Sequence, residues 1–255
     1  MVAVAVVLIG LVIGSFLNVV IARVPERRSL VHPRSACPGC GAMIAWYDNI
    51  PILSFLVLRA RCRTCAIPIP WRYPLVEAVT AGLFLAAYLA FGPTLDAVVA
   101  AVFLATLLAI TMIDLEHQII PDVISLPGIL AGCLASLATG RVHWLDSIIG
   151  AAAGAVIITV ILLVGTWWAG QQAMGGGDIR LAAMLGAFLG WKVLIFSLFL
   201  ASFLGGIIGV ILLSTGLRGR KDPIPFGPFL AAGGAAGLFF GERMVRWYFG
   251  GFAGF

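Results

Sequence analysis

The sequence predicts an all-α polytopic membrane protein with about eight transmembrane helices and one small extramembrane domain. Of its 255 residues, 62% are hydrophobic and only 11% are charged, whereas soluble domains carry about a quarter charged residues. Apolar runs of about 20 residues, long enough to cross a bilayer, recur along most of the chain. The net charge of +5 does not indicate a nucleic-acid partner, because membrane proteins collect Lys and Arg in their cytoplasmic loops.

The first apolar run is expected to remain as a membrane helix, because it has no basic n-region and no small-residue cleavage site before the Arg cluster that follows it. The sequence therefore predicts three parts: a first transmembrane helix (1–22), a cytoplasmic loop domain (23–72) and a membrane bundle (73–255). The expected segments of the bundle are 73–91, 96–113, 122–139, 147–168, 179–190, 193–216 and 226–248, of which 179–190 is short for a membrane crossing.

The basic residues predict the orientation of these segments. Twelve of the sixteen Lys and Arg residues fall on the side of the 23–72, 169–178 and 217–225 loops, and four fall on the other side. The positive-inside rule makes the richer side cytoplasmic. Both chain termini are then expected outside, and the loop carboxylates are expected to face the cytoplasm.

The loop domain carries two CxxC pairs with the spacing C-x2-C-x21-C-x2-C, formed by Cys37, Cys40, Cys62 and Cys65. Two such pairs about twenty residues apart are typical of a zinc ribbon, and Gly39 is expected to allow the tight turn of the first pair. Four thiolates leave no open coordination position, which predicts a structural zinc ion that folds this short domain. Two disulfides or free thiols are the alternative, which a cytoplasmic location disfavours. The fifth cysteine, Cys133, is expected to pack in an apolar helix.

Asp114 occupies an unfavourable position for a purely structural carboxylate. It ends the uncharged run 97–113, where the negative end of the helix dipole opposes its charge. An ionisable group at membrane depth is a functional hypothesis by default. Two other acids have simpler explanations: Asp122 follows Pro121 at the start of a helix, and Asp178 follows three glycines, so both could serve only as helix caps.

Asp114 and Asp178 are more informative together, because each is expected at the cytoplasmic end of a membrane helix. Two carboxylates in one site cannot both ionise easily, so they hold one proton between them. This is the aspartic-protease arrangement, in which one carboxylate takes a proton from water and the other donates a proton to the scissile carbonyl. The sequence has no GxSxG or HExxH motif that would support another hydrolytic mechanism.

Five stretches in order resemble the type IV prepilin peptidase family: "GSFLNVVIARVP", the cysteine-bearing loop, "DLEHQIIPD", "GGGDIRLAAMLG" and "PIPFGPFLAAG". The resemblance implies an inner-membrane peptidase with Asp114 and Asp178 as the catalytic pair and zinc on the four cysteines. It also implies that the substrates are type IV prepilins or type II secretion pseudopilins, cut after Gly and before Phe. By resemblance alone, N-methylation with S-adenosylmethionine follows; no Gly-rich cofactor motif supports it independently. Arg180 stands where the family usually has Lys, and the two differ in titration and geometry.

Three alternatives and one refinement accompany this prediction. The same carboxylates could serve another GxGD-type intramembrane protease or a proton-coupled transporter, and the cysteines could belong to a scaffold without activity. The zinc loop and the "PFGPF" stretch favour the prepilin prediction. Within it, Glu116 and Asp122 are hypothesised to attract the basic leader of the substrate.

Overall fold

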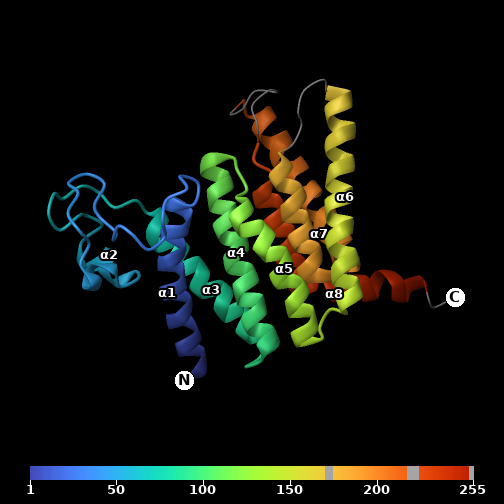
Figure 1. The fold of residues 1–255 in the computed structure, drawn as a ribbon, viewed down its shortest axis with the longest axis horizontal. Helices are drawn as coiled ribbons and strands as arrows, with labels where there is room; N and C mark the ends of the chain where they lie inside the picture. Colours follow the sequence, from blue (N-terminus) through green and yellow to red (C-terminus); the bar gives the residue numbers. More distant parts are fainter. Residues whose placement is uncertain (170–174, 217–223, 253–255) are drawn as a thin grey trace. The chain divides into compact units, whose positions relative to one another are not determined.

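The computed structural model describes residues 1–169, 175–216 and 224–252. In these ranges all regular elements are helices, and β pairing is limited to two isolated bridges. Figure 1 follows the helices along the chain: α1 (Val2–Arg23), η1 (Trp46–Asn49), α2 (Leu53–Val57), α3 (Arg72–Phe91), α4 (Leu95–His117), α5 (Asp122–Thr139), α6 (Trp144–Ala169), α7 (Gly176–Ser214) and α8 (Gly227–Phe252). The chain divides into two compact units, Met1–Ala109 and Ile110–Phe255.

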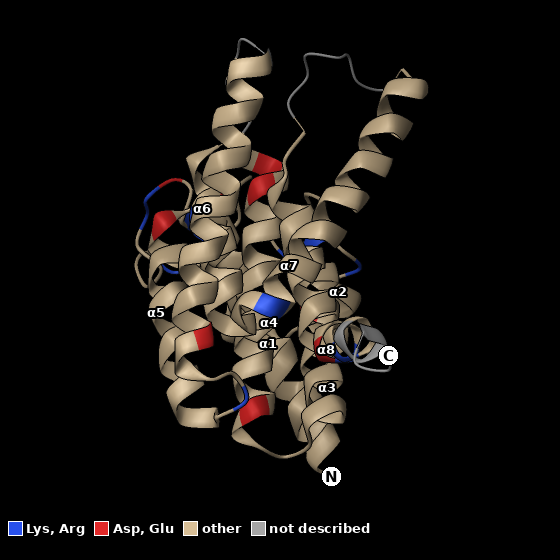
Figure 2. Ribbon diagram, turned by 90° about the vertical axis from the view of Figure 1, so that its right-hand side faces the viewer, with Lys and Arg blue, Asp and Glu red and all other residues tan. Residues whose placement is uncertain are grey.

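Six of the described helices are long and apolar enough to cross a membrane, namely α1, α3, α4, α5, α6 and α7. Figure 2 shows that most of the helical ribbon carries neither acidic nor basic residues. Large apolar side chains are exposed along these helices, for example Leu8, Val160 and Phe199. Exposed apolar side chains along a spanning helix are those that contact lipid, so the chain is a multi-pass membrane protein as the composition predicts.

The first unit is built on an antiparallel pair, α1 and α3, which small residues bring into close contact. A methyl group on Gly10 would lie 2.7 Å from Ala81 Cα, and one on Gly14 would lie 2.6 Å from Glu77 Cα. One turn further along α1, Asn18 Nδ2 donates to the carbonyl oxygen of Tyr73 at 3.1 Å. Small residues allow membrane helices to approach this closely.

The start of α7 and its stretch around Gly205 both lie close to the start of α8. A methyl group on Gly177, at the start of α7, would lie 2.7 Å from Ile120 Cβ. Further along α7, Gly205 packs against Phe229 of α8. A methyl group on Gly227, at the start of α8, would lie 3.3 Å from Ile120 Cδ1. A straight helix would separate Gly177 from Gly205 by about 42 Å. The element therefore contains two helices that fold back on each other.

The reversal in α7 occurs at Gly190, whose φ of 74° and ψ of 161° are not helical. This left-handed φ favours glycine, the residue without a Cβ. The predicted segments 179–190 and 193–216 are thus the two arms of α7. Counting each arm as one pass and α8 as another gives the eight expected passes, although α8 is not among the six helices above. The boundaries 1–22, 23–72 and 73–255 stay a prediction.

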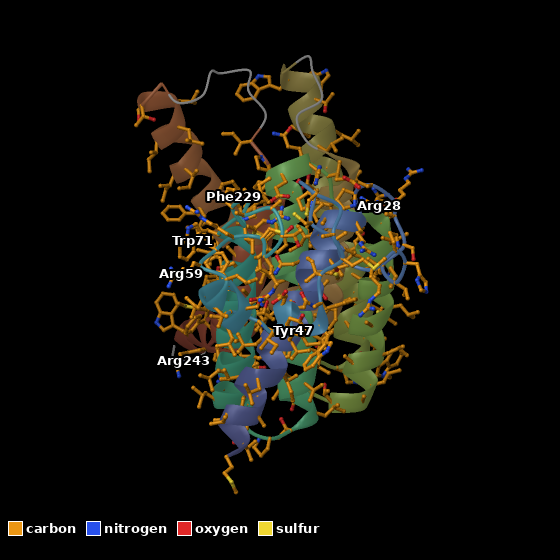
Figure 3. The ribbon with its side chains drawn as sticks, turned by 90° about the vertical axis from the view of Figure 1, so that its left-hand side faces the viewer. Arg28, Tyr47, Arg59, Trp71, Phe229 and Arg243 are labelled. Atoms are coloured by element: carbon orange, nitrogen blue, oxygen red, sulfur yellow. The ribbon has the colours of Figure 1, made fainter. Side chains whose placement is uncertain are left out.

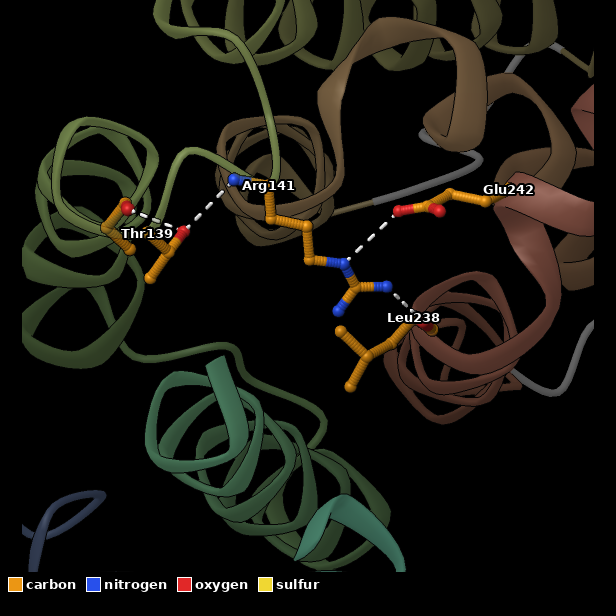
Figure 4. Close-up of polar contacts among 5 residues, drawn as sticks. Thr139, Arg141, Leu238 and Glu242 are labelled. Carbon is orange, nitrogen blue, oxygen red and sulfur yellow. Dashed lines mark hydrogen bonds and ion pairs between the residues drawn. The ribbon is translucent and has the colours of Figure 1, made fainter. Parts of the chain in front are cut away.

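The reversal is tied to neighbouring helices by polar contacts. Trp191 Nε1 donates to Asp146 Oδ1 of α6 at 3.0 Å. Arg141, between α5 and α6, donates from Nη2 to the carbonyl oxygen of Leu238 at 2.7 Å and from Nε to Glu242 Oε1 at 3.3 Å (Figure 4). These contacts join α5, α6, α7 and α8 at the end of the second unit opposite to Ile120, which we call the clamped end.

Candidate functional site

Asp114 lies in the last turns of α4 and is 5% exposed. The backbone N–H of Gly227, at the start of α8, donates to Asp114 Oδ2 at 2.9 Å. A methyl group on Gly227 would lie 2.5 Å from the same oxygen, so no larger residue fits without displacing the carboxylate. The N-terminus of α8 therefore faces the carboxylate, and its partial positive charge compensates the unfavourable C-terminal position on α4 that the sequence indicated.

Asp178 lies in the first turn of α7 and is 6% exposed. Its Oδ2 accepts the backbone N–H of Gly175 at 3.1 Å, which is the reciprocal half of a capping box. The capping role considered from the sequence is therefore real for Asp178.

The two buried carboxylates come together within the second unit. Gly177, next to Asp178, and Gly227, next to Asp114, both pack on Ile120. Gly227 donates to the Asp114 carboxylate and Gly177 directly precedes Asp178, so both carboxylates lie around Ile120. The end of α4 and the beginnings of α7 and α8 thus converge on one site, which we call the acid end. Two carboxyl groups in such a site can act as an acid–base pair.

Asp122 and Arg180 form an ion pair beside the acid end. Arg180 Nη2 lies 2.8 Å from Asp122 Oδ1 and joins the first turns of α5 and α7. Asp122 is the first residue of α5, directly after the N-cap residue Pro121, where a helix N-terminus favours a carboxylate. The helix-start explanation for Asp122 therefore fits the structure, and the same carboxylate also pairs with Arg180. Glu116 lies 4.0 Å from His117 on α4.

Gly227 and Ile120 are the residues that sequence reasoning did not assign to this site. Gly227 lies in "PFGPF", a stretch that the sequence marks only as a family signature. A glycine between Phe and Pro was the available signal. Its contact with Asp114 joins positions 113 residues apart, which no local pattern reveals.

In the first unit, Cys37, Cys40, Cys62 and Cys65 gather their Sγ atoms within 4.8 Å of one another. The Sγ atoms of Cys37 and Cys65 are 3.7 Å apart. Four sulfurs at about 2.3 Å from one tetrahedral zinc ion are separated by about 3.8 Å. None of the five cysteines, all of which the structure describes, forms a disulfide. The donor set therefore fits a four-thiolate metal site.

The two CxxC pairs have the same backbone design. Cys37 N–H donates to the carbonyl of Ala42, and Cys62 N–H donates to the carbonyl of Ile67, each at 2.9 Å. The turns close with left-handed residues immediately after the second cysteine, Gly41 (φ 71°) and Ala66 (φ 57°). The expectation that Gly39 makes the tight turn was wrong. Gly41 makes the tight turn instead. Gly39 lies close to the side chain of Ile67, because a methyl group on Gly39 would be 3.0 Å from Ile67 Cδ1.

The thiols of the second pair differ in acidity. Backbone N–H groups of Cys65 and Thr64 lower the pKa of Cys62 to about 6. The backbone N–H of Ile67 favours the Cys65 thiolate, but desolvation and the other thiols outweigh it and raise the pKa of Cys65 to about 12. Cys62 therefore ionises readily, whereas ionisation of Cys65 is opposed. A divalent cation would supply the charge that lets all four ionise.

The fold and the two sites define a class: a multi-pass helical membrane protein with a buried carboxylate pair and a four-thiol loop. Comparison with known families agrees. Residues 8–91 match the bacterial peptidase A24 N-terminal domain, and residues 101–210 match the type IV leader peptidase family. The chain belongs to the type IV leader peptidase family, which confirms the resemblance found in the sequence motifs.

Curated relatives support this membership over most of the chain. A prepilin leader peptidase/N-methyltransferase of Myxococcus xanthus is 47% identical over 86% of this chain and 66% of its own length. Proteins of the same name from Aeromonas hydrophila and Pseudomonas aeruginosa are 40% and 38% identical, over 94% and 98% of this chain and 91% and 93% of their own. No solved structure matches the chain. Membership of a peptidase family favours the peptidase prediction over the transporter and scaffold alternatives.

Proposed function

We propose that the chain is a membrane aspartic endopeptidase that removes the basic leader from type IV prepilins or type II secretion pseudopilins. The observation that carries the proposal is that two buried carboxylates, Asp114 and Asp178, both lie around Ile120 at one end of the second unit. The relatives' names supply the substrate class. By the family resemblance, the bond cut follows a Gly and precedes a Phe.

In the proposed mechanism the pair holds one proton. The ionised carboxylate takes a proton from water, and the water oxygen attacks the scissile carbonyl carbon. The protonated carboxyl donates its proton to the carbonyl oxygen and becomes ionised. When the tetrahedral intermediate collapses, the carboxyl that gained the water proton passes it to the leaving nitrogen and the C–N bond breaks. The other carboxylate takes back a proton from a hydroxyl of the intermediate, which leaves the product acid and restores the singly protonated pair. The bonds from Gly227 and Gly175 keep each carboxylate in place through these steps.

The proposal extends to location and to a second activity. Positive loops favour a bacterial inner-membrane protein with its N-terminus outside and the acid end at the cytoplasmic face. Transfer of a methyl group from S-adenosylmethionine to the new N-terminus is proposed from the relatives' names. Glu116 and Asp122 are proposed to attract the leader's cations, and a leader cation must compete with Arg180 for Asp122.

The test of the catalytic pair is cleavage of a prepilin with a Gly–Phe junction by the purified protein in lipid. Asp114→Asn and Asp178→Asn keep size and polarity but remove the titratable proton, and each is expected to lower kcat about 10²–10⁴-fold. Asp122→Asn is the matched control: it should keep its kcat, and only its KM should rise if Asp122 attracts the leader's cations. A variant of either paired residue that cuts at the wild-type rate would overturn the assignment. Mass spectrometry of the product with S-adenosylmethionine tests methylation.

We propose that the four cysteines bind one structural zinc ion, because they fit a closed tetrahedral site. Each Cys→Ser change in this set is expected to abolish stoichiometric zinc and make the 23–72 loop sensitive to protease, since metal binding drives folding of such short domains. Cys133→Ser, in α5, is the control and should retain both zinc and resistance. Elemental analysis and limited proteolysis measure the two outcomes, and a zinc-free wild type with a resistant loop would contradict the proposal.

A further inference from the structure

The short helix α2 in the cysteine-bearing loop presents an apolar face that nothing in its unit covers. Leu56 is 63% exposed and Val57 is 67% exposed, with Leu53 beside them. On the opposite face Phe55 is buried, and its ring lies 4.8 Å from that of Trp71. Trp71 itself is 74% exposed. Burial of Phe55 is enough to hold α2, so the outward apolar side chains need another explanation.

A hydrogen bond fixes the depth of α2 relative to the membrane helices. The N–H of Ile52, the N-cap residue of α2, donates to Glu77 Oε2 at 2.7 Å. Glu77 is the sixth residue of α3, about 7.5 Å along the axis from its first residue. Figure 1 likewise draws α2 beside α1 instead of beyond the end of α1. The helix therefore lies level with the entering turns of the spanning helices.

The first turns of α3 also present apolar side chains outward. Leu75 and Val79, which follow Trp71 along α3, are exposed. Trp at the start of a spanning helix is typical of the membrane–water interface. The loop is also attached at both ends to spanning helices, which keeps α2 near the bilayer whatever else it contacts.

Cations follow this face along the chain. Arg59 and Arg61 are exposed and come two and four residues after the end of α2, whereas Arg63 is paired with Asp48 at 2.6 Å. Figure 3 shows Arg59 and Trp71 on the same side of the unit and Arg28 on the other. An apolar face flanked by Arg is complementary to an anionic bilayer surface.

We propose that Leu53, Leu56, Val57 and Trp71 form an interfacial anchor. These side chains lie at the boundary between headgroups and acyl chains, and Arg59 and Arg61 contact anionic headgroups. The anchor holds the cysteine-bearing loop flat against the membrane. Lipid is favoured over a protein partner because the bond from Ile52 to Glu77 holds α2 level with the first turns of α3, and two exposed cations follow the helix.

The test places a nitroxide label at position 56 of the full-length protein in nanodiscs of phosphatidylcholine and phosphatidylglycerol. A ketone-bearing unnatural residue carries the label, so the cysteines stay unmodified. The matched control is a label at Arg28, which follows the end of α1 and is hydrogen-bonded back to Arg23. The ratio of oxygen to nickel-chelate accessibility is expected to be at least about threefold higher at position 56, because oxygen partitions into lipid and the chelate stays in water.

Each outcome decides the proposal. A label at 56 as open to the chelate as the label at 28 overturns it. Protection from both reagents shows that protein covers the face, either the rest of the chain or a second copy, and overturns it too. Where added phosphatidylglycerol raises the ratio of oxygen to nickel-chelate accessibility in the wild type, the Arg59→Gln/Arg61→Gln variant should show no such rise. Since the readout is accessibility and not cleavage, it is independent of the proposed peptidase activity.

Discussion

The acid end and the clamped end of the second unit are held together by different means. At the clamped end, side chains of Arg141 and Trp191 bond across helices. At the acid end, Asp114 and Asp178 each accept a hydrogen bond from a backbone N–H. Two glycines, Gly177 and Gly227, pack closely on Ile120 because they have no side chain. The difference indicates that the clamped end contributes stability, whereas the acid end positions reactive groups through close packing. Each change below tests one side of this contrast.

The largest effect is expected from adding a methyl group at the acid end. Gly227→Ala would place carbon 2.5 Å from Asp114 Oδ2, and Gly177→Ala would place it 2.7 Å from Ile120 Cβ. Either change displaces a carboxylate, and a misplacement of about 1 Å can cost about 10²-fold in rate. We expect kcat/KM to fall by about that factor in the prepilin assay.

Gly176→Ala is the matched control, because nothing lies within 4 Å of a methyl group on Gly176. It adds the same atom one residue away and should keep kcat/KM within about twofold, as expected of a substitution that meets no neighbour. Thermal midpoints of all three variants show whether any has simply lost its fold. If Gly227→Ala is folded and fully active, close packing does not position Asp114.

The same contrast shows how far the sequence predicts the structure. Apolar runs predict the helices because, in lipid, the backbone N–H and C=O groups of each run must form hydrogen bonds with one another. The cysteine cluster is also predictable, since its geometry is made locally within two turns of the chain. The sequence indicates the reversal in α7 only as a gap between two predicted segments. The structure locates it at Gly190.

What the sequence did not predict depends on contacts between distant positions. The bond between Gly227 and Asp114 and the ion pair between Asp122 and Arg180 join helices that are neighbours only in the folded bundle. The five-residue helix α2 was missed because its run is too short for a periodic signal. Its position depends on Glu77, 25 residues away.

At the clamped end, Arg141→Met is expected to reduce stability without reducing catalysis. The change removes the bond to the carbonyl of Leu238 from a side chain that is 22% exposed. Hydrogen bonds to a charged group contribute about 1.5–3 kcal/mol, so the midpoint of unfolding should fall while kcat/KM at low temperature is unchanged.

Glu242→Gln is the control for this change, because the Glu242 side chain is 56% exposed and a pair in water contributes little. Its midpoint should stay close to that of the wild type. Equal losses in the two variants would show that the ion pair, and not the bond to Leu238, stabilises this end. A large loss of cleavage in folded Arg141→Met would contradict the separation of the two ends.

The smallest effect is expected at the Asp122–Arg180 pair, which borders the acid end but is 53% and 36% exposed. Exposed pairs contribute about 0.2–1 kcal/mol, so Asp122→Asn and Arg180→Met should each change kcat/KM by no more than about fivefold. Arg180→Met could even raise it, because it frees Asp122 for the leader, and Arg180→Lys should change it least, because it keeps the charge. The double variant should be no worse than either single one, since both remove the same contact. A loss of about 10²-fold in Asp122→Asn alone would instead place this carboxylate among the reacting groups, and the acid end would then contain three functional acids.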